Sequence, residues 1–587
     1  MKKVLLVFML SVLCSVTFAQ ENHWTGPDSH SYFTNMAFIG KVAINGEIQN
    51  TADIEIAAFV VDTCRASARL RTFTQTPDQY WAFLTIYYTV AGEPLTFKIY
   101  YHGKEFEVDG CIATMGDNTV DVVTAGSMGT FGTPVILDFS VRLFEGGASD
   151  DNWNTAENWL GNVIPTADED AIINAPAIIP EGYVAEVNHV TINANGSVTV
   201  ANGGQLKQQT ENLEVTMQKA IEGYSESGGY YLIAAPFTSP IAVPVSMTDA
   251  PYDLYMFDQS YPLAEWRNHK VHGFDLEQGF GYLYANIEDM TVSLTGGVSS
   301  TSDQKDIIVY YDENSNLPGF NLVGNPFTCD AYLLEGGEDY LEMNGDGTGF
   351  ELAAGSAISP MKGIFVEVTP DQEVVTFVTE NPNGKSKAVT LRLSNSQSAK
   401  LDAVRVRMNG GRSMNKLVLN ENATKLYIPQ DGKDYTVVTA EAEGRMPVNF
   451  KAATNGTYTL NAEIENTKLN YLHLIDNLTG TDVDLLANPS YSFDASTTDY
   501  ASRFTLVFAE NTGVGENNDA PFAFISNGNI IVNGEGTLQM VDMMGRVIRT
   551  VGLSQCGSRT IAGMTPGVYM LRLTNGNTVK TQKIAVE

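Results

Sequence analysis

The 587-residue sequence has few cysteines and histidines and almost no long apolar runs. Its five cysteines form no CxxC pair and no zinc-ligand spacing, which excludes the usual structural zinc modules. Only seven histidines are present, and neither HExxH nor GxSxG occurs, so the metalloprotease and α/β-hydrolase signatures are absent. Beyond the N-terminal segment no stretch approaches the ~20 apolar residues that a membrane helix needs, so no transmembrane anchor is expected.

Positive charge is also scarce. The chain has 35 Lys and Arg against 69 Asp and Glu, and 35 − 69 is a net charge of −34. Phosphate backbones and anionic lipid surfaces would repel such a chain, so nucleic acid is not an expected partner. An acidic surface is compatible with divalent cations such as calcium, but solubility is the simpler explanation, and we expect no cofactor and no bound metal.

The residues that are abundant favour strands and turns. Hydrophobic content is 43% and charged content 18%, which is typical of folded domains, and the length suggests ~4 of them. Runs such as FIGKVAING and YWAFLTIYY alternate apolar and polar residues and are broken by glycine, aspartate and asparagine. We therefore predict an all-β chain of tandem β-sandwich and short β-helix-like modules that ends in a small immunoglobulin-like domain.

The first residues carry an export pattern. Two lysines precede an apolar run from Val4 to Leu13, and Thr17 and Ala19 stand at positions −3 and −1 of a cut before Gln20. This arrangement predicts a secretory signal peptide. Export makes disulfides possible in the mature chain.

Four cysteines remain after that cut. Cys64 and Cys111 lie in one predicted module and could pair as a disulfide. Cys329 and Cys556 lie far apart, and we expect them to stay as small buried apolar residues.

Composition shifts and turn clusters predict seven parts. They are residues 1–19 (signal peptide), 20–140 (N-terminal β-sandwich), 141–221 (short β-helix-like module), 222–380 (duplicated two-half β module), 381–510 (β-sandwich), 511–521 (linker) and 522–587 (C-terminal β domain).

Two modules near the N-terminus carry motifs of exported surface proteins. The piece IAAFVVDTCRA resembles a recurring surface module on the basis of Asp62, Cys64 and Arg65. Trp153 and Trp159 resemble the opening of short β-helical segments, followed by strands with Asn-Gly turns. These two tryptophans could stack on sugar rings, but buried packing is the more common role and the one we expect.

One motif occurs twice. The chain reads GGYYLIAAPF at residues 228–237 and PGFNLVGNPF at residues 318–327, and a glycine-led strand follows each, at Gly281 and Gly363. A duplication explains this pattern economically. It predicts two β halves around one core, each ending in a glycine-led hairpin.

Between the two motifs lie an aromatic stretch and an acidic loop. The stretch resembles surface-protein β modules in which Tyr255, Phe257, Trp266 and Tyr282 recur as aromatics. The loop EMNGDGTGFE alternates oxygen-bearing residues as a calcium loop does, but Gly355 replaces the carboxylate expected at its twelfth position. A tight turn is the preferred interpretation, and calcium stays the alternative.

The C-terminal stretch has the most specific pattern. Residues 381–510 resemble a β-sandwich that often precedes a secretion tail. The tail itself is similar to the C-terminal sorting domain of the type IX secretion system, through three pieces in order: DMMGR, GVYML and KTQKI. The matching residues are Asp542, Gly545, Arg546, Gly567, Tyr569, Lys580 and Lys583.

Charge sets this tail apart from the rest of the chain. From residue 522 onward six Lys and Arg stand against three Asp and Glu, a net charge of +3. The resemblance implies handling by the type IX secretion machinery, passage through the outer membrane and removal of the tail. It also implies tethering of the cargo to surface polysaccharide, and it does not identify the cargo's activity.

Three functional hypotheses follow. The first is a non-catalytic cell-surface or secreted protein, an adhesin or ligand-binding protein for a glycan or host protein. The second is a structural surface-layer component. The third is an unrecognised polysaccharide-active hydrolase, because a pair of catalytic carboxylates need only meet in space.

Overall fold

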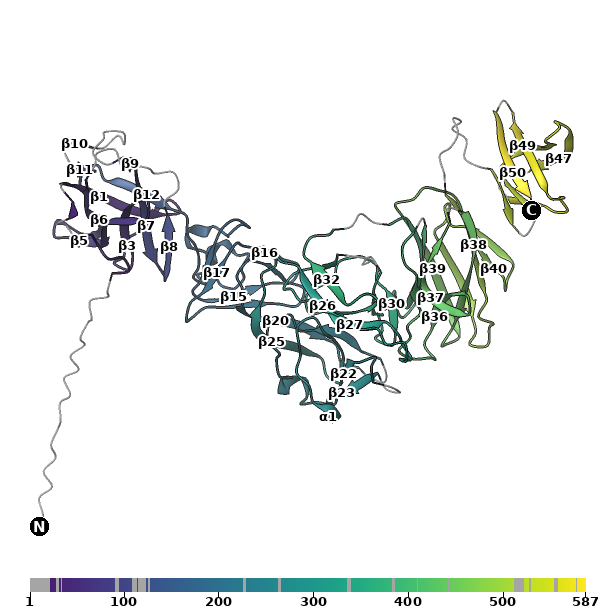
Figure 1. Ribbon diagram of the computed structural model, residues 1–587, viewed down its shortest axis with the longest axis horizontal. Helices are drawn as coiled ribbons and strands as arrows, with labels where there is room; N and C mark the ends of the chain where they lie inside the picture. Colours follow the sequence, from purple (N-terminus) through teal and green to yellow (C-terminus); the bar gives the residue numbers. More distant parts are fainter. Residues whose placement is uncertain are drawn as a thin grey trace, which may run out of the picture. The chain divides into compact units, whose positions relative to one another are not determined.

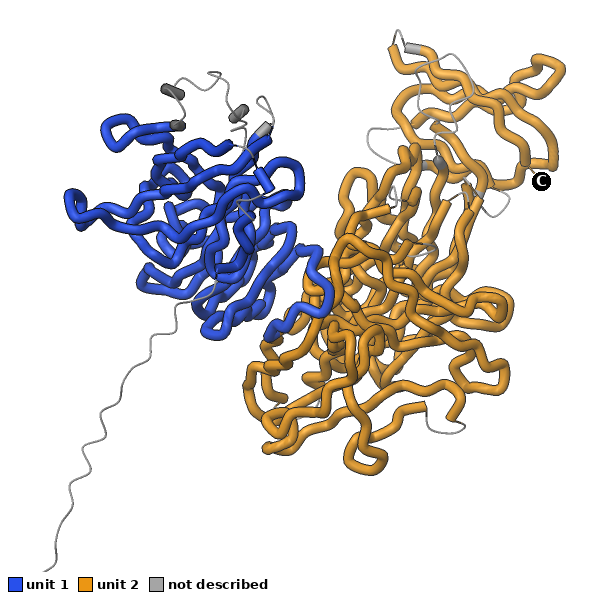
Figure 2. The backbone as a smooth tube through the Cα atoms, turned by 60° about the vertical axis from the view of Figure 1, so that its left-hand side comes forward, with its two compact units in different colours: residues 1–216 blue, residues 217–587 orange. Residues whose placement is uncertain are grey.

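The structure is a computed structural model, shown in Figure 1. It describes residues 22–27, 31–32, 34–89, 94–107, 113–114, 123–124, 127–224, 228–261, 265–334, 339–382, 386–408, 410–441, 443–510, 522–526, 529–553, 558–576 and 578–586. None of the helices in these ranges is long and apolar enough to cross a membrane. The chain divides into two compact units, residues 1–216 and 217–587 (Figure 2).

The first module of unit 1 is a sandwich of two sheets. Strands β1, β2, β5, β6 and β10 to β12 form one sheet, and β3, β4 and β7 to β9 form the other. Their bounds are β1 (Thr34–Ile44), β2 (Glu47–Ile48), β3 (Glu55–Val60), β4 (Thr63–Arg69), β5 (Arg71–Phe73), β6 (Thr76–Tyr88), β7 (Pro94–Tyr101), β8 (Lys104–Glu107), β9 (Ala113–Thr114), β10 (Val123–Thr124), β11 (Ser127–Met128) and β12 (Val135–Phe139).

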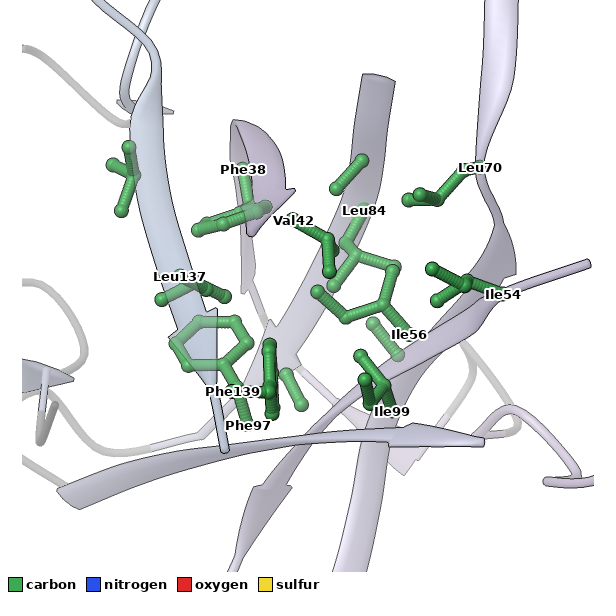
Figure 3. Close-up of a cluster of buried hydrophobic side chains, with 14 of the residues drawn as sticks. Phe38, Val42, Ile54, Ile56, Leu70, Leu84, Phe97, Ile99, Leu137 and Phe139 are labelled. Atoms are coloured by element: carbon green, nitrogen blue, oxygen red, sulfur yellow. The ribbon is translucent and has the colours of Figure 1, made fainter. Parts of the chain in front are cut away.

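The core of this sandwich follows from its alternating sequence. In β1 every second residue is buried, so one face of the strand points inward. Figure 3 shows Ile56 and Ile99 of one sheet and Leu84, Leu137 and Phe139 of the other pointing into one apolar cluster. The predicted sandwich is confirmed.

The second module of unit 1 is a short stack of parallel strands. Arg142 pairs with Ala171, and Ala171 pairs in turn with Val190, so three successive coils lie in parallel register. The elements are β13 (Arg142–Phe144), η2 (Ala156–Asn158), η3 (Leu160–Asn162), β14 (Ala171–Ile173), β15 (Pro176–Ile179), β16 (Val184–Glu186), β17 (Val190–Ile192), β18 (Ser197–Val200) and β19 (Gln205–Lys207). This is the predicted β-helical arrangement.

The next module holds the repeated motif, and both of its halves use one strand order. The first half runs β21–β24–β22–β23 and the second β27–β31–β29–β30. In each half the strand of the repeated motif pairs antiparallel with the glycine-led strand. The elements, from the strand that crosses the unit boundary onward, are β20 (Leu213–Ile221), β21 (Tyr231–Ala234), η4 (Val245–Met247), β22 (Tyr252–Phe257), β23 (Trp266–Asn268), α1 (His269–His272), β24 (Gly281–Asn286), β25 (Met290–Val298), β26 (Lys305–Ile308), β27 (Phe320–Gly324), β28 (Tyr332–Leu333), β29 (Leu341–Met343), β30 (Phe350–Leu352), β31 (Gly363–Glu367) and β32 (Val374–Val378).

The predicted glycine-led hairpins are wrong. The strand β31 does not pair with the following β32, which pairs with β26 and β28 in another sheet. Likewise β24 pairs with β21 and β22, and the following β25 belongs to a different sheet. Because both edges of the glycine-led strand are already occupied, the next strand has to leave the sheet.

The two halves meet where the repeated motif has small residues. A Cβ atom on Gly324 would lie 2.4 Å from the Cβ of Ala234 and 2.5 Å from the carbonyl oxygen of Phe280. Two backbone hydrogen bonds cross between the halves at equivalent positions: Ala234 N–H donates to Met361 O at 2.9 Å, and Gly324 N–H donates to Gly279 O at 2.8 Å. One apolar cluster contains residues from both halves, among them Leu232, Leu283, Phe320, Leu322 and Phe365.

The strands of the following β domain form one continuous hydrogen-bonded set, which packs around a single apolar core. In spatial order its strands are β41–β40–β43–β38–β36–β37–β34–β33–β39–β42, with β35 beside β37. Their bounds are β33 (Ala388–Asn395), β34 (Asp402–Met408), β35 (Met414–Asn415), β36 (Lys425–Gln430), β37 (Lys433–Ala440), β38 (Glu443–Lys451), β39 (Gly456–Glu465), β40 (Leu469–Asp476), β41 (Thr481–Asp484), β42 (Ser490–Ala495) and β43 (Phe504–Glu510).

The C-terminal domain consists of two small sheets, β44–β45–β48 and β47–β46–β49–β50, around one apolar core. The strands are β44 (Ala523–Ser526), β45 (Asn529–Asn533), β46 (Gly536–Asp542), β47 (Val547–Leu553), β48 (Ser558–Ile561), β49 (Gly567–Asn575) and β50 (Thr578–Val586). The all-β prediction with a small terminal sandwich is therefore confirmed.

Candidate functional site

A cleft rich in aromatic residues opens within unit 2, with a cavity volume of about 690 Å3. We call it the tyrosine cleft. It is lined by Tyr224, Gly228, Tyr230, Asp253, Tyr255, Trp266, Leu283, Ala285, Gly347, Thr348, Leu419, Asn420 and Glu421. These residues come from the first half of the duplicated module, from the loop between β29 and β30, and from a loop of the following β domain.

The aromatic wall is built on the β22–β23 strand pair. Trp266 is opposite Phe257 in the register, and its ring packs edge-on against Phe257 at 5.3 Å and against Phe365 at 5.9 Å. Tyr255 lies two residues before Phe257 on the same face of β22, with its ring centroid 6.4 Å from that of Trp266. Packing from behind therefore holds the tryptophan in place while its ring stays half-buried in the cleft.

Asp253 is the acidic group on the same face of β22. The Tyr230 hydroxyl donates to Asp253 Oδ2 at 3.1 Å, and Lys270 Nζ donates to Asp253 Oδ1 at 3.4 Å. The ammonium of Lys270 also lies 4.6 Å from the ring centroid of Tyr252, which helps to keep it beside the carboxylate. Burial, and after it the charge of Asp253, raise the pKa of Tyr230, so this phenol stays neutral and acts as a donor.

A glycine turn closes one side of the cleft. Gly347 has φ +64, and a Cβ there would lie 2.4 Å from the backbone nitrogen of Tyr230, so only glycine fits this approach. The Oδ1 of Asn344 accepts from the backbone N–H groups of Thr348 and Gly349, at 2.9 and 3.0 Å. The oxygens of the acidic loop thus close a tight turn, as the preferred interpretation of the sequence predicts.

The third side belongs to the following β domain. Asn420 Oδ1 accepts from Asn422 N–H at 2.9 Å, which holds the loop in a turn. Glu421, which is largely exposed, pairs with Lys425 at 2.9 Å. Among the described residues, the two carboxylates that line the cleft, Asp253 and Glu421, therefore each have a lysine partner.

A second hollow of about 530 Å3 lies beyond the end of β22. Gln259 lines this hollow and holds the neighbouring backbone: its Oε1 accepts from Asp312 and Gly319 N–H, and its Nε2 donates to Phe320 O. Asn321 likewise bonds both the N–H and the carbonyl of Tyr310. The amide side chains of this hollow are used by the fold itself, so the tyrosine cleft is the better ligand site.

The sorting-motif residues meet on one sheet of the C-terminal domain. Asp542 Oδ1 accepts from the N–H groups of Met544 and Arg546, each at 2.9 Å, and its Oδ2 accepts from Arg546 Nε at 2.8 Å. Gly545 has φ +80, the left-handed conformation that the turn requires. The hydrogen bond from the Arg546 backbone N–H, together with that from its side chain, lowers the pKa of Asp542.

The other two pieces of the motif form neighbouring strands. Gly567 begins β49, on which Tyr569 stands opposite Asp542 of β46. Lys580 and Lys583 lie on the adjacent β50, which pairs with β49 along its whole length. The three sequence pieces thus occupy consecutive strands of the sheet β47–β46–β49–β50.

Two further sequence predictions concern the N-terminal part. Trp153 is 0% exposed and Trp159 2% exposed, with their rings 4.9 Å apart, so the buried role is confirmed and sugar stacking on these two residues is wrong. The Cys64 thiol lies 3.5 Å from Ala66 O. Cys111 lies outside the described residues, so the disulfide stays a prediction.

The structure tests only one of the remaining predictions about the cysteines, the export signal and the linker. Cys329 is fully buried, as expected, whereas Cys556, the signal peptide and the linker at residues 511–521 fall outside the described ranges.

The cleft itself was not predicted from the sequence. Tyr255 and Trp266 were singled out as recurring aromatics, but Tyr224, Tyr230 and the loop residue Asn420 were not. Tyr255 and Trp266 lie on the paired strands β22 and β23. The other residues lie in separate loops, where no apolar–polar alternation marks them in the sequence.

Comparison with known proteins identifies the tail. Residues 525–587 match the family described as "Secretion system C-terminal sorting domain". No curated protein matches the chain. The chain therefore ends in a type IX sorting domain, which is handled by the type IX secretion machinery and directs the protein to the cell surface or the extracellular space.

Likeness to solved structures is weak. A biofilm associated protein BSP domain aligns over 97% of this chain and 98% of its own, at 10% identity and a TM-score of 0.13. Escherichia coli alpha-2-macroglobulin activated by porcine elastase aligns over 94% of this chain and 53% of its own, at 9% identity and a TM-score of 0.08. TM-scores this low carry no argument about fold or function.

Proposed function

We propose that the chain is a non-catalytic binding protein of the cell surface or the extracellular space, an adhesin in the broad sense, and that the tyrosine cleft holds its ligand. The cleft carries this proposal. Its volume of about 690 Å3 lies within the range of small-molecule sites, and its lining combines half-buried rings with a few polar groups. Such rings offer large contact area with little conformational freedom to lose on binding.

The carboxylates of the cleft favour binding over hydrolysis. A glycosidase needs an acid with a raised pKa within reach of the substrate. Asp253 and Glu421 each pair with a lysine. The carboxyl whose pKa is raised to about 7, Glu351, is 1% exposed and does not line the cleft.

The test uses the full exported protein, recovered from the medium or the washed cell surface, against panels of glycans and matrix proteins. We expect saturable binding to at least one ligand and a loss of affinity of about tenfold or more in Tyr255→Ala, since aromatic anchors dominate binding energies. Tyr500→Ala, an exposed tyrosine of the β domain, is the matched control and should bind as the wild type does. Absence of binding on both panels would overturn the proposal, and self-association without any ligand would favour a structural surface-layer role.

A further inference from the structure

The tyrosine cleft also restricts the chemistry of the ligand, an inference that rests on the proposed function. Its aromatic members are three tyrosines and one tryptophan, Tyr224, Tyr230, Tyr255 and Trp266, all half-buried. Each has an apolar ring and a polar tip. A ligand that fits them needs apolar faces and hydrogen-bonding edges within the same small unit.

Charge inside the cleft is balanced. Asp253 is paired with Lys270 at 3.4 Å, and Glu421 is paired with Lys425 at 2.9 Å. An aromatic site that binds an ammonium group would present its carboxylates unpaired to that cation. A cationic peptide or amine is therefore not favoured by these pairs, although the rings alone would suit one.

An anionic ligand is disfavoured by the rest of the protein. The chain has a net charge of −34, and the two carboxylates among the described lining residues, Asp253 and Glu421, place further negative charge in the cleft. The two lysines are used to neutralise these carboxylates and do not line the cleft. The balance of charges therefore selects a neutral ligand.

Hydrogen-bonding capacity remains for such a ligand. A carboxylate offers about four acceptor sites, and Asp253 uses two of them, for the Tyr230 hydroxyl and the Lys270 ammonium. Thr348 and Asn420 add further polar groups to the lining. A purely apolar ligand would leave these groups without partners, which costs free energy.

The geometry points to a neutral carbohydrate as the ligand of the tyrosine cleft. The C–H face of a sugar ring stacks on the wall of Tyr255 and Trp266, and its hydroxyl groups donate to the carboxylate of Asp253. Stacking on the rings supplies most of the affinity, and Asp253 sets the orientation of the ring.

The experiment measures binding of the full exported protein to an array of neutral, amino-sugar and sialylated or sulfated glycans, at low and high salt. We expect neutral glycans to bind, with an affinity that changes less than about twofold with salt because no net charge is neutralised. Tyr224→Ala and Trp266→Ala should each weaken that binding at least about tenfold. Tyr224→Ala keeps the test decisive if Trp266→Ala perturbs folding, and Tyr500→Ala is the control.

Each other outcome is informative. A preference for amino-sugar or acidic glycans, or affinity that falls fivefold or more at high salt, overturns the neutral-ligand inference. Binding to matrix proteins alone also overturns it and leaves the proposed binding function standing. Glycan binding that both cleft variants retain overturns it together with the placement of the ligand in the cleft, and leaves only the binding role of the protein. Failure to bind any ligand overturns the proposed function itself.

Discussion

Glu351 holds its carboxyl group in surroundings that disfavour a negative charge. The side chain is 1% exposed, and neither of its oxygens has a hydrogen-bond partner among the described residues. Glu342 stands directly opposite it across the β29–β30 pair, and the ammonium of Lys400 is 4.0 Å away. Burial first, and the charge of Glu342 second, raise the pKa of Glu351 to about 7.

This shift makes stability depend on pH. Because the folded-state pKa lies above the ordinary value of 4.5, the folded chain holds the Glu351 proton over an interval in which the unfolded chain has released it. The stabilising contribution is complete below about pH 4.5 and is lost as the pH rises to about 7. A rise of the pKa from 4.5 to about 7 corresponds to about 3 kcal/mol in the free energy of unfolding.

Glu351→Gln should remove this dependence, because the amide cannot ionise. We expect the variant to be more stable than the wild type at pH 8, by about 1–3 kcal/mol, and to differ little from it at pH 4.5. Denaturant unfolding at both pH values measures the effect. Glu463→Gln, a half-exposed carboxylate that pairs with Arg392, is the matched control. Parallel pH profiles for wild type and Glu351→Gln would contradict the prediction.

At the scale of strands, the repeated motif has a geometric reason. Both copies end in Pro-Phe, and Gln278 Nε2 donates to the carbonyls of both prolines, to Pro236 at 3.3 Å and to Pro326 at 3.1 Å. The ends of β21 and β27 are thus held by one side chain. Small residues at the preceding positions, Ala234 and Gly324, let the two strands approach.

Gly324→Ala should therefore destabilise this module. The added Cβ would meet the backbone oxygen of Phe280 at 2.5 Å, which cannot rotate away as a flexible side chain can. Overpacking of this kind costs about 1–3 kcal/mol. Gly456→Ala, at the start of β39, is the control because nothing lies within 4 Å of its added Cβ. Equal unfolding midpoints for the two variants would show that the halves separate easily.

Period-2 alternation predicted strands well, because burial on one face of a sheet imposes it directly. Pairing partners were harder to predict. The sequence shows that β25 follows β24, but it does not show that both edges of β24 are already bonded, so the expected hairpin was wrong. The two tryptophans of the β-helical module were placed correctly because buried packing is their common role.

At the scale of the whole molecule, the cleft depends on segments far apart in sequence. Tyr230, Thr348 and Asn420 come from three loops, and a backbone hydrogen bond from Tyr230 N–H to Gly347 O at 3.3 Å joins the first of these loops to the second. A resemblance to surface-protein β modules drew attention to Tyr255 and Trp266, but it did not place them in a cleft. The lysine partners had no signal that could identify them: Lys270 lies 17 residues from Asp253, and Lys425, although only four residues from Glu421, is not on a helix with it.

The sorting domain, by contrast, could be recognised from the sequence, since its motif consists of three short runs, at residues 542–546, 567–571 and 580–584, that lie on neighbouring strands of one sheet. Its charge of +3 within a chain of −34 suits a separately recognised surface.

Deletion of residues 525–587 should therefore stop export at the outer membrane while the N-terminal signal still directs entry to the periplasm. Fractionation of cells that produce the full or the truncated chain measures this, with mass spectrometry of the termini. We expect the exported form to begin at Gln20 and to end before Phe522. An exported form that keeps its tail would contradict only the expected removal of the tail. Export of the truncated chain would mean that another segment carries the signal for passage through the outer membrane. In either case the tyrosine cleft stays in the exported protein, because its lining ends at Glu421.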